Sequence, residues 1–501
     1  MSSKKQERNF LKARDGCGSP DLGRLVAEQD PNLQDYYVAP ERYVSRAQNI
    51  NDPAVFFVGP KGIGKSAVLQ MVRLLRKADA DRIINILPDD LAFTSLANVE
   101  TNTPILAQAG RNQGLFKSLW DYILALEVLR REYTTEMSIV QYLTAFLRPQ
   151  HEKQARTLIA LSVGGAPQSL SERILQLIKE IEIAGEIHGA KISGTVTLTT
   201  PQQSAGNQLN LLSLVNSVAK HVADNLKHPY YILIDDLDLH WYDSPLQNAF
   251  IAALFLSLRH FSKPPNLKCV VAIKDEIYRH LPLADRDKFH DWVCRVTWDG
   301  PSVKKMIEQR LVAKLDCTPR DVWGQVFPKN GFDKIWRHTN GKPREAIRLA
   351  SFCVEEARSR DHLRVSDEDI VSGMREFSDE RRTDLAKEYQ FQYEGLELVT
   401  HKFAGWPKEF PVSKLSEVAE MITIEVGLAE RHSARYKWAA GFDNDLKGFA
   451  RILLECGFFQ IKVSRTAAAK PYDLDSPEQL TDETYLAINP MYAPGLGLVG
   501  A

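Results

Sequence analysis

The pattern that most constrains this chain is a glycine-rich loop between an apolar run and a helix-forming run. The residues at 54–58 are uniformly apolar and predict a buried strand, and those at 67–72 predict the start of a helix. The residues around this junction match G-x-x-x-x-G-K-[ST] in full: Gly59, Pro60, Lys61, Gly62, Ile63, Gly64, Lys65 and Ser66, with Ala67 next. A chance glycine-rich turn is the alternative, and the flanking strand and helix argue against it. In this context the pattern predicts a phosphate-binding loop.

Each residue type in the loop has a physical role in binding a nucleotide. Glycines let backbone N–H groups approach phosphates without a side chain in the way. The helix that follows contributes the partial positive charge of its N-terminus at the same point. We expect Lys65 to reach the β- and γ-phosphates of ATP and the Ser66 hydroxyl to hold Mg²⁺.

A second apolar run ends in a cluster of carboxylates. Residues 231–234 predict a strand, and Asp235, Asp236 and Asp238 follow at its end. Ligands of open α/β sheets bind at this carboxyl edge. We expect Asp235 to hold Mg²⁺ directly or through water, and Asp236 to orient or deprotonate the attacking water. Asp238 either supports one of these roles or caps the next helix.

Composition agrees with a globular enzyme of several domains. The chain has 501 residues and a formal net charge of −1, so no global field favours nucleic acid or an anionic membrane. Its longest apolar stretch, 250–258, is far below a membrane-spanning length, and the N-terminus has no secretory apolar region. The six cysteines are scattered without metal-ligand spacing. We expect a cytoplasmic protein that does not bind membranes.

The order of predicted elements divides the chain into regions. Strands alternate with helices up to residue 300, and only helices follow as far as residue 390, which favours an α/β domain and then a helical one. The expected regions are an N-terminal arm (1–35), a nucleotide-binding core (36–300) with a helical and hairpin insertion (about 90–225), a helical lid (301–390) and a winged-helix-like domain (391–501).

The last region raises the question of DNA binding. Helices predicted at 413–422 and 443–455 precede strands at 458–463 and 484–488, which is the order of a winged helix. Residues 380–501 nevertheless carry 14 Lys and Arg against 18 Asp and Glu. Domains that bind DNA phosphates usually have the opposite balance. Contact with protein is therefore favoured over contact with nucleic acid, which stays possible.

Together these motifs resemble the STAND and KAP branch of the AAA-like P-loop ATPases, in particular bacterial ATPases encoded in defence islands. The resemblance is carried by 59–66, by Ile-Asp-Asp-Leu-Asp at 234–238, by Asn-Gly-Lys-Pro-Arg at 340–344 and by the terminal winged helix. It implies an α/β P-loop NTPase fold with a parallel sheet, in which the strand at 267–273 lies between the two motif-bearing strands. It also implies a helical lid and, in many relatives, assembly controlled by ATP.

The resemblance assigns roles to three further cations. Arg344 corresponds to a sensor arginine that reaches the γ-phosphate from the lid, and the alternative is a surface arginine at the start of a helix. Lys274 lies where these enzymes sense the γ-phosphate, although a lysine differs from their usual polar residue. Arg286 lies in the zone of a trans-acting arginine finger, and the alternative is pairing with its flanking aspartates.

The predicted activity is Mg²⁺-dependent ATP hydrolysis used as a conformational or assembly switch, in a bacterial anti-phage defence or signalling system. ATP is preferred over GTP because no guanine-recognition motif follows the core strands. The expected partners are ATP and either further copies of the chain or a separate effector protein. Two alternatives stay open: a DNA-handling ATPase of the initiator or loader type that uses the winged helix, and a nucleotide-binding scaffold without hydrolysis.

Overall fold

The computed structural model describes most of the chain outside the predicted insertion. The described residues are 9–12, 22–38, 41–86, 113–133, 226–237, 241, 244–261, 265–283, 286–390, 392–428, 433–462, 464–472 and 479–499, with short pieces at 152–153, 156, 197–198, 209–210, 220–222 and 224. They form two compact units, one of residues 39–297 and one that joins residues 1–38 to 298–501.

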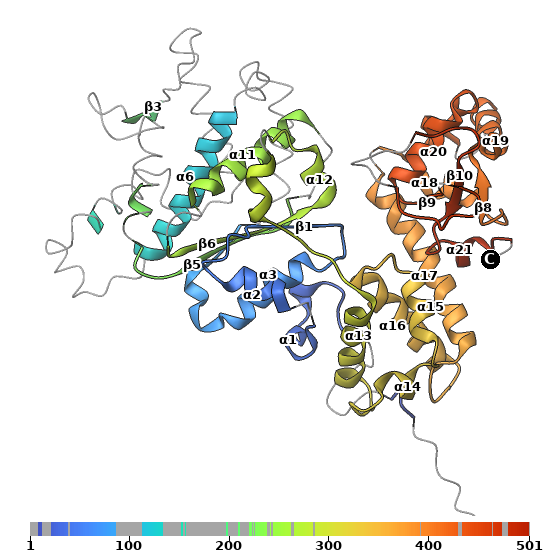
Figure 1. The fold of residues 1–501 in the computed structure, drawn as a ribbon, viewed down its shortest axis with the longest axis horizontal. Coiled ribbons are helices and arrows are strands. Elements are labelled where there is room, and N and C mark those ends of the chain that lie inside the picture. Colours follow the sequence, from blue (N-terminus) through green and yellow to red (C-terminus); the bar gives the residue numbers. More distant parts are fainter. Residues whose placement is uncertain are drawn as a thin grey trace, which may run out of the picture. The chain divides into compact units, whose positions relative to one another are not determined.

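The first unit is built on a five-stranded parallel sheet (Figure 1). Its strands are β1 (Phe56–Gly59), β2 (Ile83–Ile86), β5 (Tyr230–Ile234), β6 (Leu267–Lys274) and β7 (Val293–Arg295). The order across the sheet is β2-β5-β6-β1-β7, and every neighbouring pair is parallel. The predicted α/β fold is confirmed, and β6 does lie between β1 and β5.

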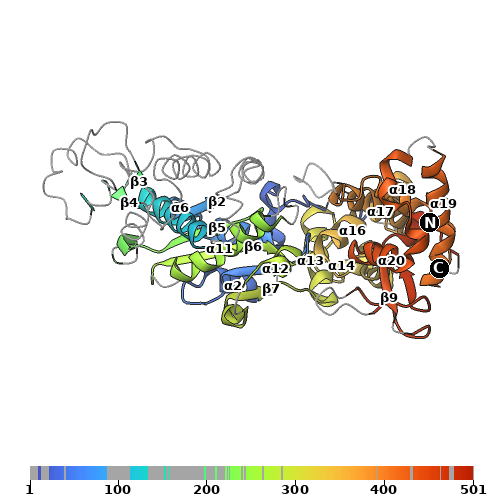
Figure 2. The same ribbon diagram turned by 90° about the horizontal axis from the view of Figure 1, so that it is seen from above.

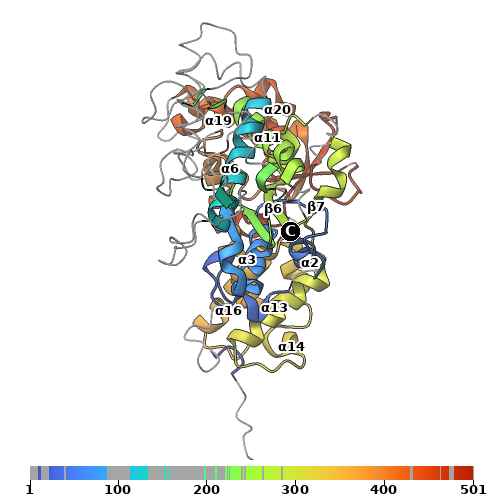
Figure 3. The same ribbon diagram turned by 90° about the vertical axis from the view of Figure 1, so that its left-hand side faces the viewer.

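The sheet strands are nearly continuous apolar runs because both faces of the sheet are covered. The helices α2 (Glu41–Gln48) and α3 (Lys65–Leu75) lie on one face, while α11 (Pro245–Phe261) lies on the other (Figures 1 and 3). Phe56 of β1 stacks on Phe255 of α11, with ring centroids 3.5 Å apart.

The helix α6 (Gln113–Tyr133) is the best-described part of the predicted insertion, and it packs along α11 (Figures 1 and 2). The apolar stripe predicted there is buried: Phe116, Leu119, Trp120 and Ile123 are at most 4% exposed. The Trp120 indole donates a hydrogen bond to the Phe250 carbonyl at 3.0 Å. Most of the remaining insertion lies outside the described residues. Within it, β3 (Thr197–Leu198) pairs antiparallel with β4 (Leu209–Asn210).

The second unit begins with a helical region. Its helices are α13 (Gly300–Lys314), α14 (Val322–Val326), α15 (Gly331–Arg337), α16 (Pro343–Ser359) and α17 (Asp367–Glu388). α16 and α17 pack side by side (Figure 2). α13 begins at a cap in which the Asp299 carboxylate accepts the Ser302 N–H at 2.7 Å. Such a cap satisfies an amide that the helix itself leaves without a partner.

The N-terminal segment belongs to the core of this second unit. Leu11 and Leu22 are 1% exposed and lie in the same apolar cluster as α13 and α16. Asp30 is buried, accepts the Tyr36 hydroxyl at 2.5 Å and lies 3.7 Å from the guanidinium of Arg310 on α13. A buried carboxylate needs such partners. We expected an arm here because the segment is mostly polar. Its few buried residues could not be recognised from that composition.

The C-terminal part has the element order of a winged helix. The elements are α18 (Leu396–His401), β8 (Glu409–Pro411), α19 (Ser416–Gly427), α20 (Leu446–Glu455), β9 (Phe459–Lys462) and β10 (Tyr485–Ile488). The strands form an antiparallel sheet in the order β8-β10-β9. Phe410, Leu486 and Ile461 face the core from adjacent strands. In the described part of the chain, no helix is both long and apolar enough to span a membrane.

Candidate nucleotide-binding site

The loop between β1 and α3 has a backbone that depends on glycine. Gly62 and Gly64 have φ angles of +81° and +97°, and Gly64 is the N-cap of α3. Side chains other than hydrogen disfavour this left-handed region. At Gly59 the constraint is space, because a Cβ would lie 3.0 Å from the Ile63 side chain and 3.2 Å from the Val296 carbonyl oxygen. The glycine positions of the motif are thus required by the geometry of this loop.

Lys65 folds back over the loop from the first turn of α3. Its ammonium group donates to the carbonyl oxygens of Gly59 at 2.8 Å and Pro60 at 3.0 Å. The amine is therefore held at the first two residues of the loop by carbonyl groups, which a phosphate could replace as acceptors. Ser66 is the next residue of the helix, and the first turn carries no acidic side chain. The partial positive charge of the helix N-terminus is consequently not neutralised within that turn.

The two described carboxylates after β5 differ in their surroundings. Asp235 is 6% exposed, and one of its oxygens accepts the Asp236 N–H at 3.0 Å. Asp236 is exposed and has a φ of +56°, an uncommon conformation for a residue with a side chain. Strained backbone of this kind concentrates at functional sites. Asp238 lies outside the described residues.

The sheet brings the loop and the carboxylates to one edge. β1 and β5 both end at the carboxyl edge, separated by β6, so the strands are about 9–10 Å apart. Gly59 is paired with Lys274 and Ile234 with Val271, which fixes the relative height of the two motifs. The Ser66 hydroxyl and the Asp235 carboxylate are oxygen ligands of the kind that Mg²⁺ prefers. These residues fit a nucleotide–magnesium site, although their individual roles stay predictions.

Lys274 ends β6 between the two motifs and is also the N-cap residue of α12 (Asp275–His280). The Asp275 carboxylate lies 2.7 Å from the guanidinium of Arg295 on β7 and also pairs with Arg279. The sequence does not reveal the Asp275–Arg295 pair, since the two residues are 20 positions apart and only the fold places them together.

Arg286 is held by the end of α12. Its guanidinium donates to the carbonyl oxygens of Tyr278 (3.2 Å), Arg279 (2.6 Å) and Leu281 (3.0 Å). These are helix C-terminal carbonyls, which attract cations. The contacts give Arg286 a structural role that neither the arginine-finger prediction nor the aspartate alternative included.

Arg344 lies in the second unit, in the first turn of α16 after Pro343. The preceding turn contains Asn340 and Gly341, with φ angles of +46° and +69°. Its neighbour Glu345 is 7% exposed, and burial raises the pKa of that carboxyl above its usual range despite the nearby Lys342. The sensor role of Arg344 stays a prediction.

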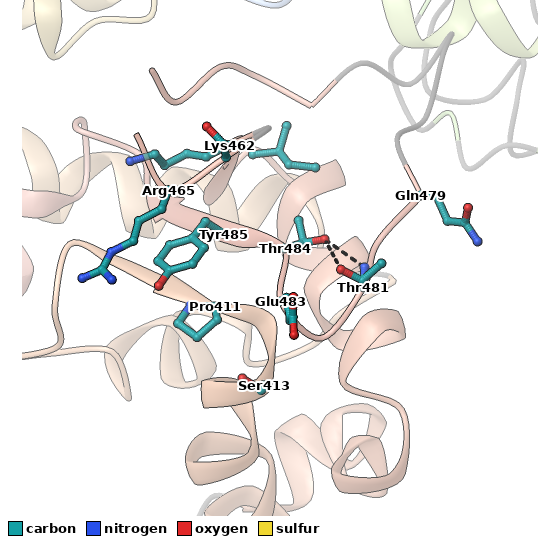
Figure 4. A pocket seen from close by; sticks show the side chains of 11 residues that line it. Pro411, Ser413, Lys462, Arg465, Gln479, Thr481, Glu483, Thr484 and Tyr485 are labelled. Carbon is teal, nitrogen blue, oxygen red and sulfur yellow. Dashed lines mark hydrogen bonds between the residues drawn. The ribbon is translucent and has the colours of Figure 1, made fainter. Parts of the chain in front are cut away.

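A groove of about 720 Å³ lies along the winged-helix sheet (Figure 4). Pro411, Lys462 and Tyr485 line it from the three neighbouring strands, since Tyr485 is paired with both of the others. Further lining residues are Ser413, Ile461, Ser464, Arg465, Gln479, Thr481, Glu483 and Thr484. Lys462 is buried and forms an ion pair with Glu409. The groove therefore combines hydroxyl groups with balanced charge.

Comparison with known proteins gives one family match. A family model described as the FunZ-associated C-terminal helical domain matches residues 301–386, which span α13 to α17. The chain is 23% identical over 386 residues to the putative transposon gamma-delta 80.3 kDa protein of Escherichia coli strain K12. That alignment covers 72% of this chain and 50% of the relative, so the chain spans about half of the relative's length.

Several solved structures are similar to this chain at low sequence identity. The Aeropyrum pernix ORC1 protein in complex with DNA is 12% identical with a TM-score of 0.41, and 94% of this chain and 95% of that chain are covered. The Aeropyrum pernix ORC2 protein is 11% identical with a TM-score of 0.40, and the match covers 93% of this chain and 97% of that chain. The sheet order and the two motifs themselves define the fold of this chain, which is that of the P-loop ATPases.

Proposed function

We propose that this chain binds ATP with Mg²⁺, hydrolyses it and uses the nucleotide cycle as a conformational or assembly switch. The observation that carries the proposal is the loop itself. Its left-handed glycines, its folded-back Lys65 and the start of α3 without acidic side chains form a preorganised polyphosphate site.

The chemistry would be in-line attack of water on the γ-phosphate. The loop amides and Lys65 would stabilise charge on the transferring phosphoryl group, and Asp236 would orient the attacking water. Ser66 and Asp235 would hold the magnesium ion, which supplies charge neutralisation when bound. The exposure of Asp236 and the burial of Asp235 support this division of roles, because only the exposed carboxylate meets solvent.

The test is a titration of the full chain with ATP, with and without Mg²⁺, beside a phosphate-release assay. We expect binding that requires Mg²⁺ and slow release of phosphate. Binding without any release would favour the nucleotide-binding scaffold. The absence of ATP binding would overturn the proposal.

The winged helix motivates a second candidate, a DNA-handling ATPase of the initiator or loader type. The element order and the groove beside β9 and β10 support it. The cations count against it, since Lys447 on α20 lies 3.7 Å from Asp482 and Lys462 is paired with Glu409. Paired cations release fewer counterions on binding DNA, so they contribute less affinity.

The pathway rests on the motif resemblance. We propose a role in a bacterial anti-phage defence or signalling system, in which the chain assembles with further copies or with a separate effector protein. The size of the protein in solution, measured with ADP and with a non-hydrolysable ATP analogue, tests the assembly. A size that does not depend on the nucleotide would remove assembly from the proposal.

A further inference from the structure

The winged-helix region has an exposed apolar stripe on α19, the helix labelled in Figure 1. Met421, Ile424 and the C-cap residue Leu428 are 39%, 59% and 69% exposed. Among the described residues, seven large apolar side chains are exposed, and three of them lie here. Spacings of three and four residues place the three on one face of the helix.

The core of the unit does not require this stripe. α19 already packs its opposite face into the core through Val418, Ala419 and Ile422, each 0% exposed. Scattered exposed apolar residues are ordinary, whereas a contiguous set marks an interaction surface. The helix is therefore apolar on two sides, and within the described part of the unit only one side is packed into the core.

The charges around the stripe are acidic on balance, because the three glutamates of α19 face two lysines, Lys402 and Lys414. α19 contains three glutamates and no lysine or arginine. Glu417 and Glu420 are exposed, about two turns and one turn before Ile424, and Glu417 also pairs with Lys414 at 2.7 Å. Lys402 lies 3.9 Å from the Met421 sulfur, but Glu425 accepts its ammonium group at 2.6 Å. The C-terminus of the helix adds partial negative charge beside Leu428.

We propose that this face of α19 docks a basic amphipathic helix of a separate protein. An apolar stripe at helical spacing fits a helix with the same spacing, and the acidic rim selects lysine and arginine on that helix. Pairing of two α19 helices would bring like charges together. DNA and anionic lipid would meet the same repulsion. The proposal deepens the proposed assembly with an effector, and it rests on that function only for the identity of the partner.

The experiment uses two synthetic helical peptides with the same leucine stripe, one flanked by lysine and arginine and the other by glutamate. We expect the full chain to bind the basic peptide at least tenfold more tightly than the acidic one, as measured by fluorescence anisotropy. Ile424→Glu and Leu428→Glu should each weaken that binding about tenfold or more. The matched control is Val371→Glu on α17, where the side chain is 46% exposed, and it should leave binding unchanged.

A charge reversal gives the sharper outcome. Glu417→Lys combined with Glu420→Lys should weaken binding of the basic peptide and strengthen binding of the acidic peptide. Equal binding of both peptides, or no effect of Ile424→Glu, would overturn the proposal. So would a wild-type dimer that Ile424→Glu dissociates, or binding to vesicles of anionic lipid. ATP turnover, measured in the same variants, separates failure of this surface from failure of the nucleotide site.

Discussion

The N-termini of α3 and α20 differ in whether they can bind an anion such as phosphate. α3 begins at Gly64, which has no side chain, and its first turn has no acidic residue. α20 begins at Asp445, whose carboxylate accepts the Gly448 N–H at 2.9 Å. The first N–H groups of a helix can donate hydrogen bonds to an anion. α3 can offer its N–H groups to a ligand, while one N–H group of α20 already donates to the Asp445 carboxylate.

The difference shows how little an element order decides by itself. The winged-helix order is found in many DNA-binding domains, but one first-turn amide of α20 is capped by its own Asp445, and Lys447 lies near Asp482. The strand–loop–helix order at 56–75 indicates a phosphate site only because of its polar groups, which are Lys65 and an N-terminus of α3 without acidic side chains. Function is therefore better judged from the partners of polar groups than from topology.

The largest effect is expected from Lys65→Ala. The ammonium group is held against the loop by the Gly59 and Pro60 carbonyls, where it would meet the phosphates, so its loss should lower ATP turnover by about 100-fold or more. Phosphate release and a calorimetric titration with ATP measure this. Lys77→Ala, an exposed lysine just beyond the far end of α3, is the control and should behave as wild type. Unchanged ATP affinity and ATP turnover in Lys65→Ala would show that the loop at 59–66 is not the nucleotide site.

Asp236→Asn should retain ATP binding and slow hydrolysis by about 100-fold, because the amide cannot accept a proton from water. Asparagine tolerates the left-handed φ of this position, so the loop should keep its shape. Asp235→Asn should instead weaken Mg²⁺-dependent binding. A single-turnover assay beside a binding assay separates the two variants. Normal hydrolysis by Asp236→Asn would transfer the role to Asp238 or another acid.

The sequence predicted the nucleotide edge better than the C-terminal unit. Every strand of the parallel sheet was predictable, because buried parallel strands are continuous apolar runs. β8 was missed, since three residues are too few to show a period. The positive φ of Asp236 and the Asp275–Arg295 pair could not be predicted, because they depend on how distant segments meet. Asp30 was hidden in a polar segment for the same reason.

The N-terminus of α17 shows how capping by side chains contributes to the stability of the fold. At α17, Ser366 and Asp369 form a capping box, and the fully buried Asp369 carboxylate also accepts from Arg360 and His362 at 2.8 Å each. Burial alone would raise the pKa of Asp369, but the hydrogen bonds from His362 and Ser366 outweigh it and lower the pKa. Asp369→Asn should cost about 1–3 kcal/mol in the free energy of unfolding.

Denaturant unfolding measures the loss of stability in Asp369→Asn. Its dependence on pH shows whether the ionised Asp369 carboxylate is the stabilising form. A carboxyl whose pKa is lower in the folded state stabilises above its unfolded pKa and loses that contribution as the pH falls. The difference between wild type and Asp369→Asn should therefore shrink on acidification below the ordinary aspartate pKa. A difference that is constant with pH would assign the effect to packing.

Arg344→Ala should give a smaller effect, about fivefold in the coupling between nucleotide state and the helical region. In wild type, hydrogen exchange across residues 335–375 should differ between the ADP and ATP-analogue forms. The variant should lose that difference. Arg358→Ala, an exposed arginine near the other end of α16, is the control and should keep it. An equal response in all three proteins would leave Arg344 as a surface arginine.

The smallest effect is expected where the comparison began, on α20. Lys447 is 48% exposed and lies near Asp482, and Arg451 is exposed one turn further along the helix. If the charges of this helix are already balanced, Lys447→Ala and Arg451→Ala should each change duplex DNA affinity by less than about twofold, and the wild-type affinity should be weak and non-specific. Gel shift at near-physiological salt measures both. Tight, sequence-selective binding that either variant abolishes would show that α20 reads DNA despite its acidic cap, and the DNA-handling function would then take first place.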